Sequence, residues 1–157
     1  GMILNYNIDF LASLFNKVIF IQTKREPAAN IASVLDARVR QYGNVEEWYS
    51  FKGPDYLTLK DEIPEIQAAG QVYYINKAVD DALKLLPEEQ KLIVQYEDFC
   101  ANPKHFYQQL REKLAFYGVE LTENYTGEKS FKPSRNPHNY EELIHYYNRF
   151  SGTKSGN

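Results

Sequence analysis

This chain of 157 residues has a single cysteine, no long apolar run and no excess of positive charge. Its single cysteine, Cys100, cannot form a disulfide within the chain, so nothing in the sequence implies an oxidising compartment. No apolar run approaches the length that crosses a membrane, and the first residues lack the basic segment and apolar core of a signal peptide. We therefore expect a cytoplasmic protein that binds no membrane.

The charge is too nearly balanced to favour nucleic acid as a partner. Asp and Glu number 21 against 18 Lys and Arg, which gives a net charge of -3. Non-specific binding of nucleic acid needs bulk positive charge, so we expect no such partner. The histidines are few and far apart, and their spacing predicts no metal site. Hydrophobic residues make up 43% of the chain, as in an ordinary globular protein, and we expect a single domain over residues 1–157.

Buried strands alternate with helices along the sequence. Apolar runs at residues 17–22 and 91–96 are typical of strands buried on both faces of a parallel sheet. Apolar residues at helical spacing predict helices over 8–16, from Pro27 to near Gly43, through Val72 to Leu86, from Pro103 to about Gly118, and from Tyr140 onward. Residues 2–6 are interpreted as a short additional strand, and residues 44–64 and 122–138 as irregular connections. This order predicts an α/β fold with a parallel sheet and flanking helices.

The turn after the first of these two strands is a candidate site for phosphate or sulfate. In open α/β sheets, ligands bind at the carboxyl ends of the strands. A helix that begins at Pro27 would turn its free N–H groups and its positive dipole end toward that crevice. Arg25 adds a guanidinium that binds such anions through two parallel hydrogen bonds, and Ser33 follows on the helix. A lone arginine after a strand is more often part of a surface ion pair, here with Glu26, and a lone serine on a helix is more often a packed or solvent-facing residue. The residues alone therefore favour a structural role over an anion site.

The stretch 17–35 resembles a signature of the sulfotransferases that use 3′-phosphoadenosine 5′-phosphosulfate. That signature is a hydrophobic strand, then Arg-x-Pro, then a Ser on the following helix, and Arg25, Pro27 and Ser33 stand at its spacing. Residues 92–103 resemble a second family segment, in which Tyr-Glu-Asp follows a strand and Asn-Pro starts a helix. The aromatic residues at 73–76 are similar to the family's helix before that strand. The resemblance covers roughly residues 8–120.

The resemblance implies a P-loop NTPase-like sulfotransferase fold and transfer of a sulfuryl group from that cosubstrate to a hydroxyl or an amine. It assigns Arg25 and Ser33 to the 3′-phosphate of the cosubstrate. Lys132 and Arg135 fall where some family members close a loop over the nucleotide, so they are further candidates for phosphate contact, although a solvated turn is the other interpretation. Asp9 lies near the place of the family's general base and is the catalytic candidate.

The chain departs from the family at the loop that cradles the 5′-phosphosulfate. Its glycines are isolated, and none begins a phosphate-binding run. We therefore expect an N-terminally incomplete fold that lacks the first strand–loop–helix unit and does not transfer sulfuryl by itself. The alternative is a degenerate homologue that serves as a nucleotide-phosphate-binding or protein-interaction module.

The missing strand also bears on assembly. Without it, the strand near residues 18–21 would leave a bare edge beside apolar surface, and such edges recruit other strands. The sequence thus predicts a homodimer. The alternative is a monomer in which residues 44–64 or the C-terminal helix cover the gap.

Overall fold

A computed structural model of the chain describes residues 2–133 and 136–152. They form two compact units, each described by itself. The helical unit contains the described residues of Gly1–Tyr6, Glu26–Ala78 and Arg135–Asn157. The sheet unit contains those of Asn7–Arg25 and Val79–Ser134.

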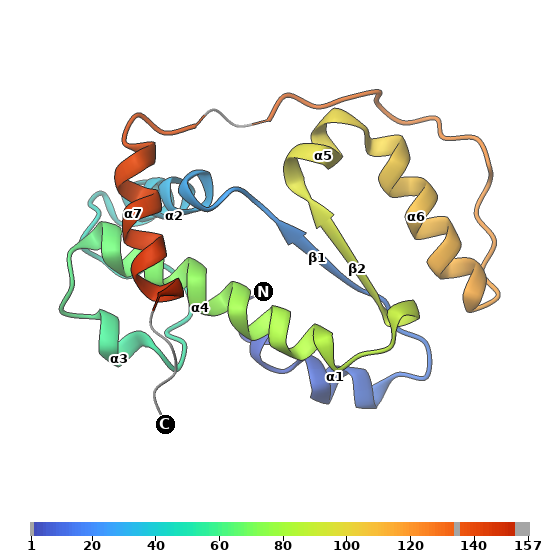
Figure 1. The fold of residues 1–157 in the computed structure, drawn as a ribbon, viewed down its shortest axis with the longest axis horizontal. Coiled ribbons are helices and arrows are strands. Elements are labelled where there is room, and N and C mark those ends of the chain that lie inside the picture. The colour runs from blue at the N-terminus through green and yellow to red at the C-terminus, as the bar shows by residue number, and fades with distance from the viewer. Residues whose placement is uncertain (1, 134–135, 153–157) are drawn as a thin grey trace. The chain divides into compact units, whose positions relative to one another are not determined.

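The chain has a mixed α/β fold in which helices flank a small, two-stranded parallel sheet (Figure 1). In chain order the elements are the 3₁₀ helix η1 (Met2–Tyr6), α1 (Ile8–Leu14), β1 (Phe20–Lys24), α2 (Pro27–Tyr42), α3 (Tyr56–Leu59), α4 (Pro64–Lys84), the 3₁₀ helix η2 (Glu88–Gln90), β2 (Lys91–Gln95), α5 (Tyr96–Ala101), α6 (Pro103–Phe116) and α7 (Tyr140–Ser151). Among the described helices, none has both the length and the apolar character needed to cross a membrane. The expected α/β class is confirmed at this level.

The two predicted strands pair in parallel, in a register that runs from Phe20 opposite Lys91 to Lys24 opposite Gln95. Because β1 covers residues 20–24, it lies about two residues later than the sequence pattern suggested. The expectation that both strands are buried on both faces is wrong. Ile21 stands opposite Leu92 on the same face, yet Ile21 is 46% exposed and Leu92 only 6%. Helices α5 and α6 contact β2, whereas the Ile21 side chain of the neighbouring strand stays partly uncovered.

The N-terminal segment does not form the expected strand. Residues Met2–Tyr6 form the 3₁₀ helix η1. In the described part of the chain the sheet contains only β1 and β2, so this segment takes no part in it. An extended segment without a partner strand leaves its backbone groups unpaired, whereas a helical turn pairs some of them locally.

The helix predicted over residues 8–16 is confirmed as α1, and it completes the core of the sheet unit. Ile8 of α1 packs against Val79 and Leu83 from the C-terminal part of α4. Phe20, the first residue of β1, also packs against this cluster. Of the apolar residues whose spacing predicted α1, Ile8 is therefore the one buried at the amino end of the sheet.

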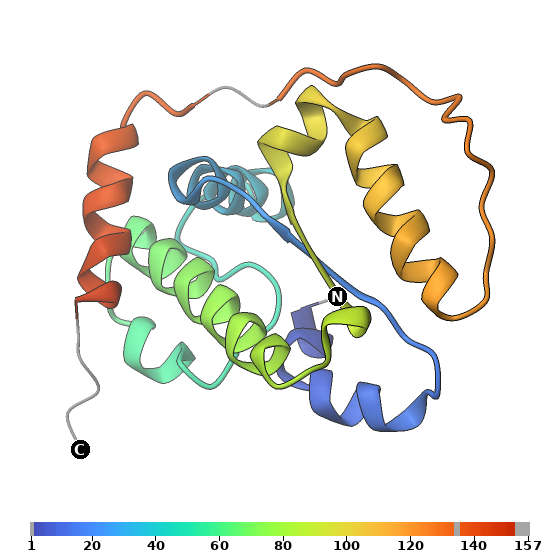
Figure 2. The ribbon, with the colours of Figure 1, turned by 45° about the vertical axis from the view of Figure 1, so that its right-hand side comes forward.

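The core of the helical unit lies where α2, α4 and α7 meet (Figure 2). Leu143 of α7 and Ile31 of α2 are fully buried there, and Ala68 and Ala69 of α4 let the helices approach closely. The apolar stripe that predicted the last helix faces this core, since Tyr140, Ile144 and Tyr147 pack around Leu143.

The predicted starts of α2 and α6 and the predicted end of α2 are confirmed, whereas α1 ends at Leu14, two residues before its predicted end. Proline occupies the first turn of α2 and of α6, where its missing N–H leaves no bond unmade. Asn102 caps α6, because its side-chain oxygen accepts a hydrogen bond from the backbone N–H of His105 at 3.3 Å. Gly43 ends α2 with φ of +80°, in the left-handed region that favours glycine.

Candidate anion-binding site

Arg25 follows the last residue of β1, at the carboxyl end of the sheet. The register places Lys24 opposite Gln95, so the two strands end at the same level, and Tyr96 is the first residue after β2. The guanidinium carbon of Arg25 lies 5.4 Å from the centroid of the Tyr96 ring, which is a cation–π contact. Sheet pairing thus brings a cation from one strand end onto an aromatic ring from the other.

One donor of this guanidinium has nothing to bind. The Nε atom of Arg25 is buried and has no hydrogen-bond partner among the described residues. A buried donor without an acceptor costs free energy. A planar guanidinium binds the oxygens of phosphate or sulfate through parallel N–H groups, so an oxyanion is the chemical group that suits Arg25.

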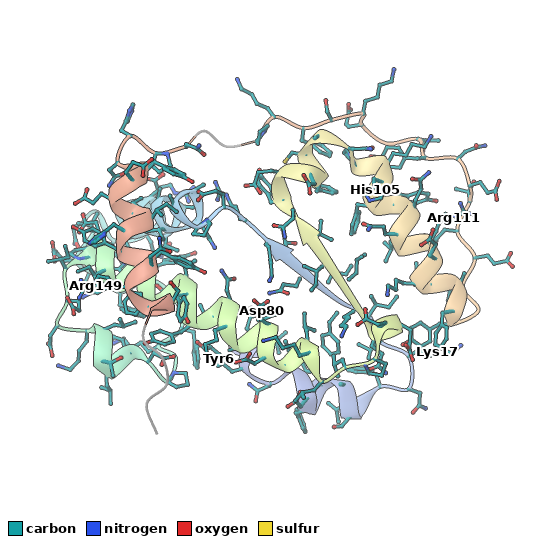
Figure 3. The ribbon with its side chains drawn as sticks, in the orientation of Figure 1. Tyr6, Lys17, Asp80, His105, Arg111 and Arg149 are labelled. Carbon is teal, nitrogen blue, oxygen red and sulfur yellow. The ribbon has the colours of Figure 1, made fainter. Side chains whose placement is uncertain are left out.

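Lys24, the neighbouring cation, is held by Asp80 of α4. Its Nζ atom lies 2.9 Å from Oδ1 and 3.0 Å from Oδ2 of Asp80. The Nε2 atom of Gln22 donates to the same carboxylate at 2.7 Å, and Figure 3 shows where Asp80 leaves α4. This network joins β1 to α4 and compensates the charge of Lys24. Lys24 therefore has a structural role, and Arg25 remains the candidate for a ligand.

The start of α2 differs from the sequence-based expectation. Its N–H groups were expected to face a ligand, but the Glu26 carboxylate accepts a hydrogen bond from the Ala29 N–H at 2.9 Å. The charge of Glu26 and its hydrogen bond also raise the pKa of the Tyr140 hydroxyl. Ser33 is half-buried on α2 in the helical unit, whereas Arg25 belongs to the sheet unit. A crevice that these two residues share stays a prediction.

Lys132 lies in the long segment after α6, which runs back beside that helix (Figure 2). The preceding residue attaches this segment to α5, because the Phe131 N–H donates to the Cys100 carbonyl at 2.7 Å and its ring stacks on Phe99. Lys132 itself is exposed, in the same unit as Arg25. Arg135, the other candidate of this segment, lies outside the described residues.

Asp9 is exposed in the first turn of α1. The adjacent Ile8 packs beside Phe20, at the amino end of β1, whereas Arg25 follows its carboxyl end. The structure therefore does not bring Asp9 to Arg25. Within residues 2–133 and 136–152, no group of three or more His, Cys, Asp or Glu side chains could hold a metal ion.

Two contacts at this end of the sheet escaped sequence reasoning. Tyr96 was recognised only as part of a motif, and Asp80 was not singled out. The signal for Tyr96 was present, because it follows the second strand as Arg25 follows the first. No local pattern points to Asp80, which lies 58 residues from Gln22 and 56 from Lys24.

Comparisons of this chain with protein-family models, curated proteins and solved structures find no match. The candidate site is therefore defined by the contact of Arg25 with Tyr96 at the paired strand ends.

Proposed function

We propose that this chain is a sulfotransferase-like domain in which Arg25 binds the 3′-phosphate of 3′-phosphoadenosine 5′-phosphosulfate. The buried, unpartnered Nε of Arg25 at the end of a parallel strand is the observation that carries the proposal. The Arg-x-Pro spacing supports it, with Pro27 in the first turn of α2. Ser33, Lys132 and Arg135 are the further phosphate contacts that we propose, and the fold is the sulfotransferase type without its first strand–loop–helix unit.

Binding and transfer are separate parts of this proposal. Sulfuryl transfer to a hydroxyl or an amine is akin to phosphoryl transfer, in which positioning and charge stabilisation lower the barrier. Arg25 would hold the 3′-phosphate, which is remote from the transferred group. We therefore propose that the chain binds the nucleotide without transferring sulfuryl by itself, and that a non-catalytic phosphate-binding module is the alternative form of the same function.

The Arg25→Ala variant is expected to bind adenosine 3′,5′-bisphosphate about tenfold to a hundredfold more weakly than the wild type. Each hydrogen bond to a charged group contributes about 1.5–3 kcal/mol, and about 1.4 kcal/mol corresponds to a factor of ten. Isothermal titration calorimetry measures the affinity. The Ser33→Ala variant should lose less, because a hydroxyl donor is neutral.

Arg40→Ala is the matched control, since Arg40 is an exposed arginine in the last turn of α2. It removes the same charge and should leave the affinity unchanged. Adenosine without phosphates should bind the wild type and Arg25→Ala equally. Equal binding of the bisphosphate by wild type and Arg25→Ala would contradict the assignment of Arg25.

We further propose that the chain forms a homodimer through the uncovered part of its sheet. Ile21 is 46% exposed on β1, and in the described part of the chain this strand has one partner strand. Exposed apolar side chains beside a strand edge favour contact with a second copy.

Light scattering at micromolar concentration should give a dimer mass for the wild type and a monomer mass for Ile21→Asp. Ile63→Asp changes an equally exposed isoleucine of the helical unit and should leave the dimer intact. A monomer mass for the wild type would exclude this assembly.

A further inference from the structure

A small cavity lined by aromatic rings lies in the helical unit, where η1, α3, α4 and the segment before α3 meet. Its volume is about 10 Å³, which is room for about one water-sized group. The side chains that matter for its chemistry are Tyr6, Trp48, Phe51, Asp55, Tyr56 and Tyr74.

The aromatic wall of this cavity is held in place by contacts within the unit. The rings of Trp48 and Tyr56 meet edge to face with centroids 4.9 Å apart. The indole N–H of Trp48 donates to the Phe51 carbonyl at 3.3 Å, and the side chain of Gln71, which is buried in α4, donates to the Tyr49 carbonyl at 3.0 Å. The segment that carries Trp48 and Phe51 is thus fixed both to itself and to α4.

The rings of this wall already attract cations. The guanidinium carbon of Arg38 lies 5.4 Å from the Trp48 ring centroid, and the Nζ atom of Lys52 lies 4.5 Å from the Tyr56 centroid. Aromatic faces carry negative electrostatic potential, and the attraction is strongest where water is excluded. The cavity therefore combines cation-attracting walls with a size that suits one small polar head group.

Asp55 supplies a negative charge at the same cavity. Its carboxyl is half-buried, and burial raises its pKa above the ordinary value for aspartate. Among the described residues, no ion pair compensates this carboxylate. Burial raises the pKa of the Tyr6 and Tyr74 hydroxyls, and the charge of Asp55 acts in the same direction. Within the part of the chain that the structure describes, this half-buried carboxylate beside aromatic rings thus has no ion-pair partner.

We propose that this cavity binds a primary ammonium group, with Asp55 as the counter-charge and the rings of Trp48, Phe51 and Tyr56 as its walls. An ammonium head is close to water in size, and it satisfies both the carboxylate and the ring faces. A quaternary ammonium is too large for the same volume. The ligand class is therefore an alkylamine or the amino group of a larger molecule. The proposal does not depend on the role given to Arg25.

The single tryptophan of the chain makes the binding directly measurable, since Trp48 lines the cavity. Titration with n-butylammonium chloride at constant ionic strength should change the Trp48 fluorescence in a saturable way. Tetramethylammonium chloride and n-butanol are the matched probes, one too large and the other uncharged. Neither should produce a saturable change.

Asp55→Asn should weaken butylammonium binding about tenfold or more, because the counter-charge is lost. Its midpoint of thermal unfolding should equal or exceed that of the wild type, since the substitution removes a half-buried charge with no ion-pair partner. Phe51→Leu, at a partly exposed position, should also weaken binding by removing one ring. Asp36→Asn removes an exposed carboxylate from α2 and should leave the affinity unchanged.

Three results would overturn the ammonium site. The first is the absence of a saturable fluorescence change with butylammonium in the wild type. The second is equal butylammonium affinity in the wild type and in folded Asp55→Asn. The third is a saturable response of the same strength to tetramethylammonium or n-butanol, which would show that neither the size of the cavity nor the charge of Asp55 selects the ligand.

Discussion

The Leu143→Ala variant is expected to lose about 2–5 kcal/mol of the free energy of unfolding, the range for a large-to-small substitution in a packed core. Leu143 is fully buried near the start of α7. It belongs to the cluster that contains Ile31 of α2 and Ala68 of α4. Truncation therefore removes apolar contacts with two helices at once and leaves a cavity that the surrounding helices refill only in part.

Urea unfolding followed by Trp48 fluorescence measures this loss, because Trp48 belongs to the same unit as α7. Leu57→Ala is the matched control. It makes the same chemical change at a leucine that is 71% exposed, so it should shift the free energy of unfolding by no more than about 0.5 kcal/mol. A loss of similar size in both variants would contradict the central place of Leu143 in the core.

Arg38→Ala is expected to lower the free energy of unfolding by about 2–4 kcal/mol, the combined effect of unsatisfied acceptors and lost packing. Arg38 is fully buried, although it is charged. Its Nη1 donates to the Val45 carbonyl at 3.0 Å and to Oε1 of Gln67 at 2.8 Å. Its removal leaves these two acceptors without that donor and withdraws the guanidinium from the ring of Trp48.

The Arg38→Met variant separates the cost of burying the Arg38 charge from the loss of packing that Arg38→Ala also causes. Burial lowers the pKa of the Arg38 guanidinium, which means that the charged form is disfavoured where it lies. Methionine removes that buried charge but fills much of the volume, so Arg38→Met should be more stable than Arg38→Ala. Arg40→Ala, at an exposed arginine of the same helix, should stay within about 0.5 kcal/mol of the wild type. Urea unfolding measures the free energy of unfolding of these three variants. Equal values for Arg38→Ala and the wild type would mean that the buried hydrogen bonds make no net contribution to stability.

Local sequence patterns were sufficient for α1, α2, α4, α6 and α7 and for the existence of the two strands. They did not predict the short helices α3, inside the stretch interpreted as irregular, and α5, directly after β2. The helix from Pro27 to Tyr42 has its proline, its apolar stripe and its closing glycine within one continuous stretch, and these features act on neighbouring turns of the same backbone. The strand pattern at residues 91–96 was equally local. It failed at residues 2–6, because a short apolar run becomes a strand only when another strand supplies hydrogen-bond partners.

The burial of the sheet also lay beyond the sequence. Ile21 has the β-branched side chain of a buried strand residue, yet it is partly exposed, whereas Leu92 beside it on β2 is buried. The type of a side chain determines how much its burial would contribute to the free energy of folding. Whether it is buried depends on how helices from distant parts of the chain pack on the sheet.

The sequence by itself determined that a cation, Arg25, follows a strand and that a helix begins at Pro27. Only the tertiary structure decided that Arg25 meets Tyr96, that Asp80 holds Lys24, and that Asp55 faces an aromatic cavity. The reason is physical. A helix or a strand is set by side chains a few residues apart, whereas the environment of a charge depends on groups that folding brings together from distant parts of the chain.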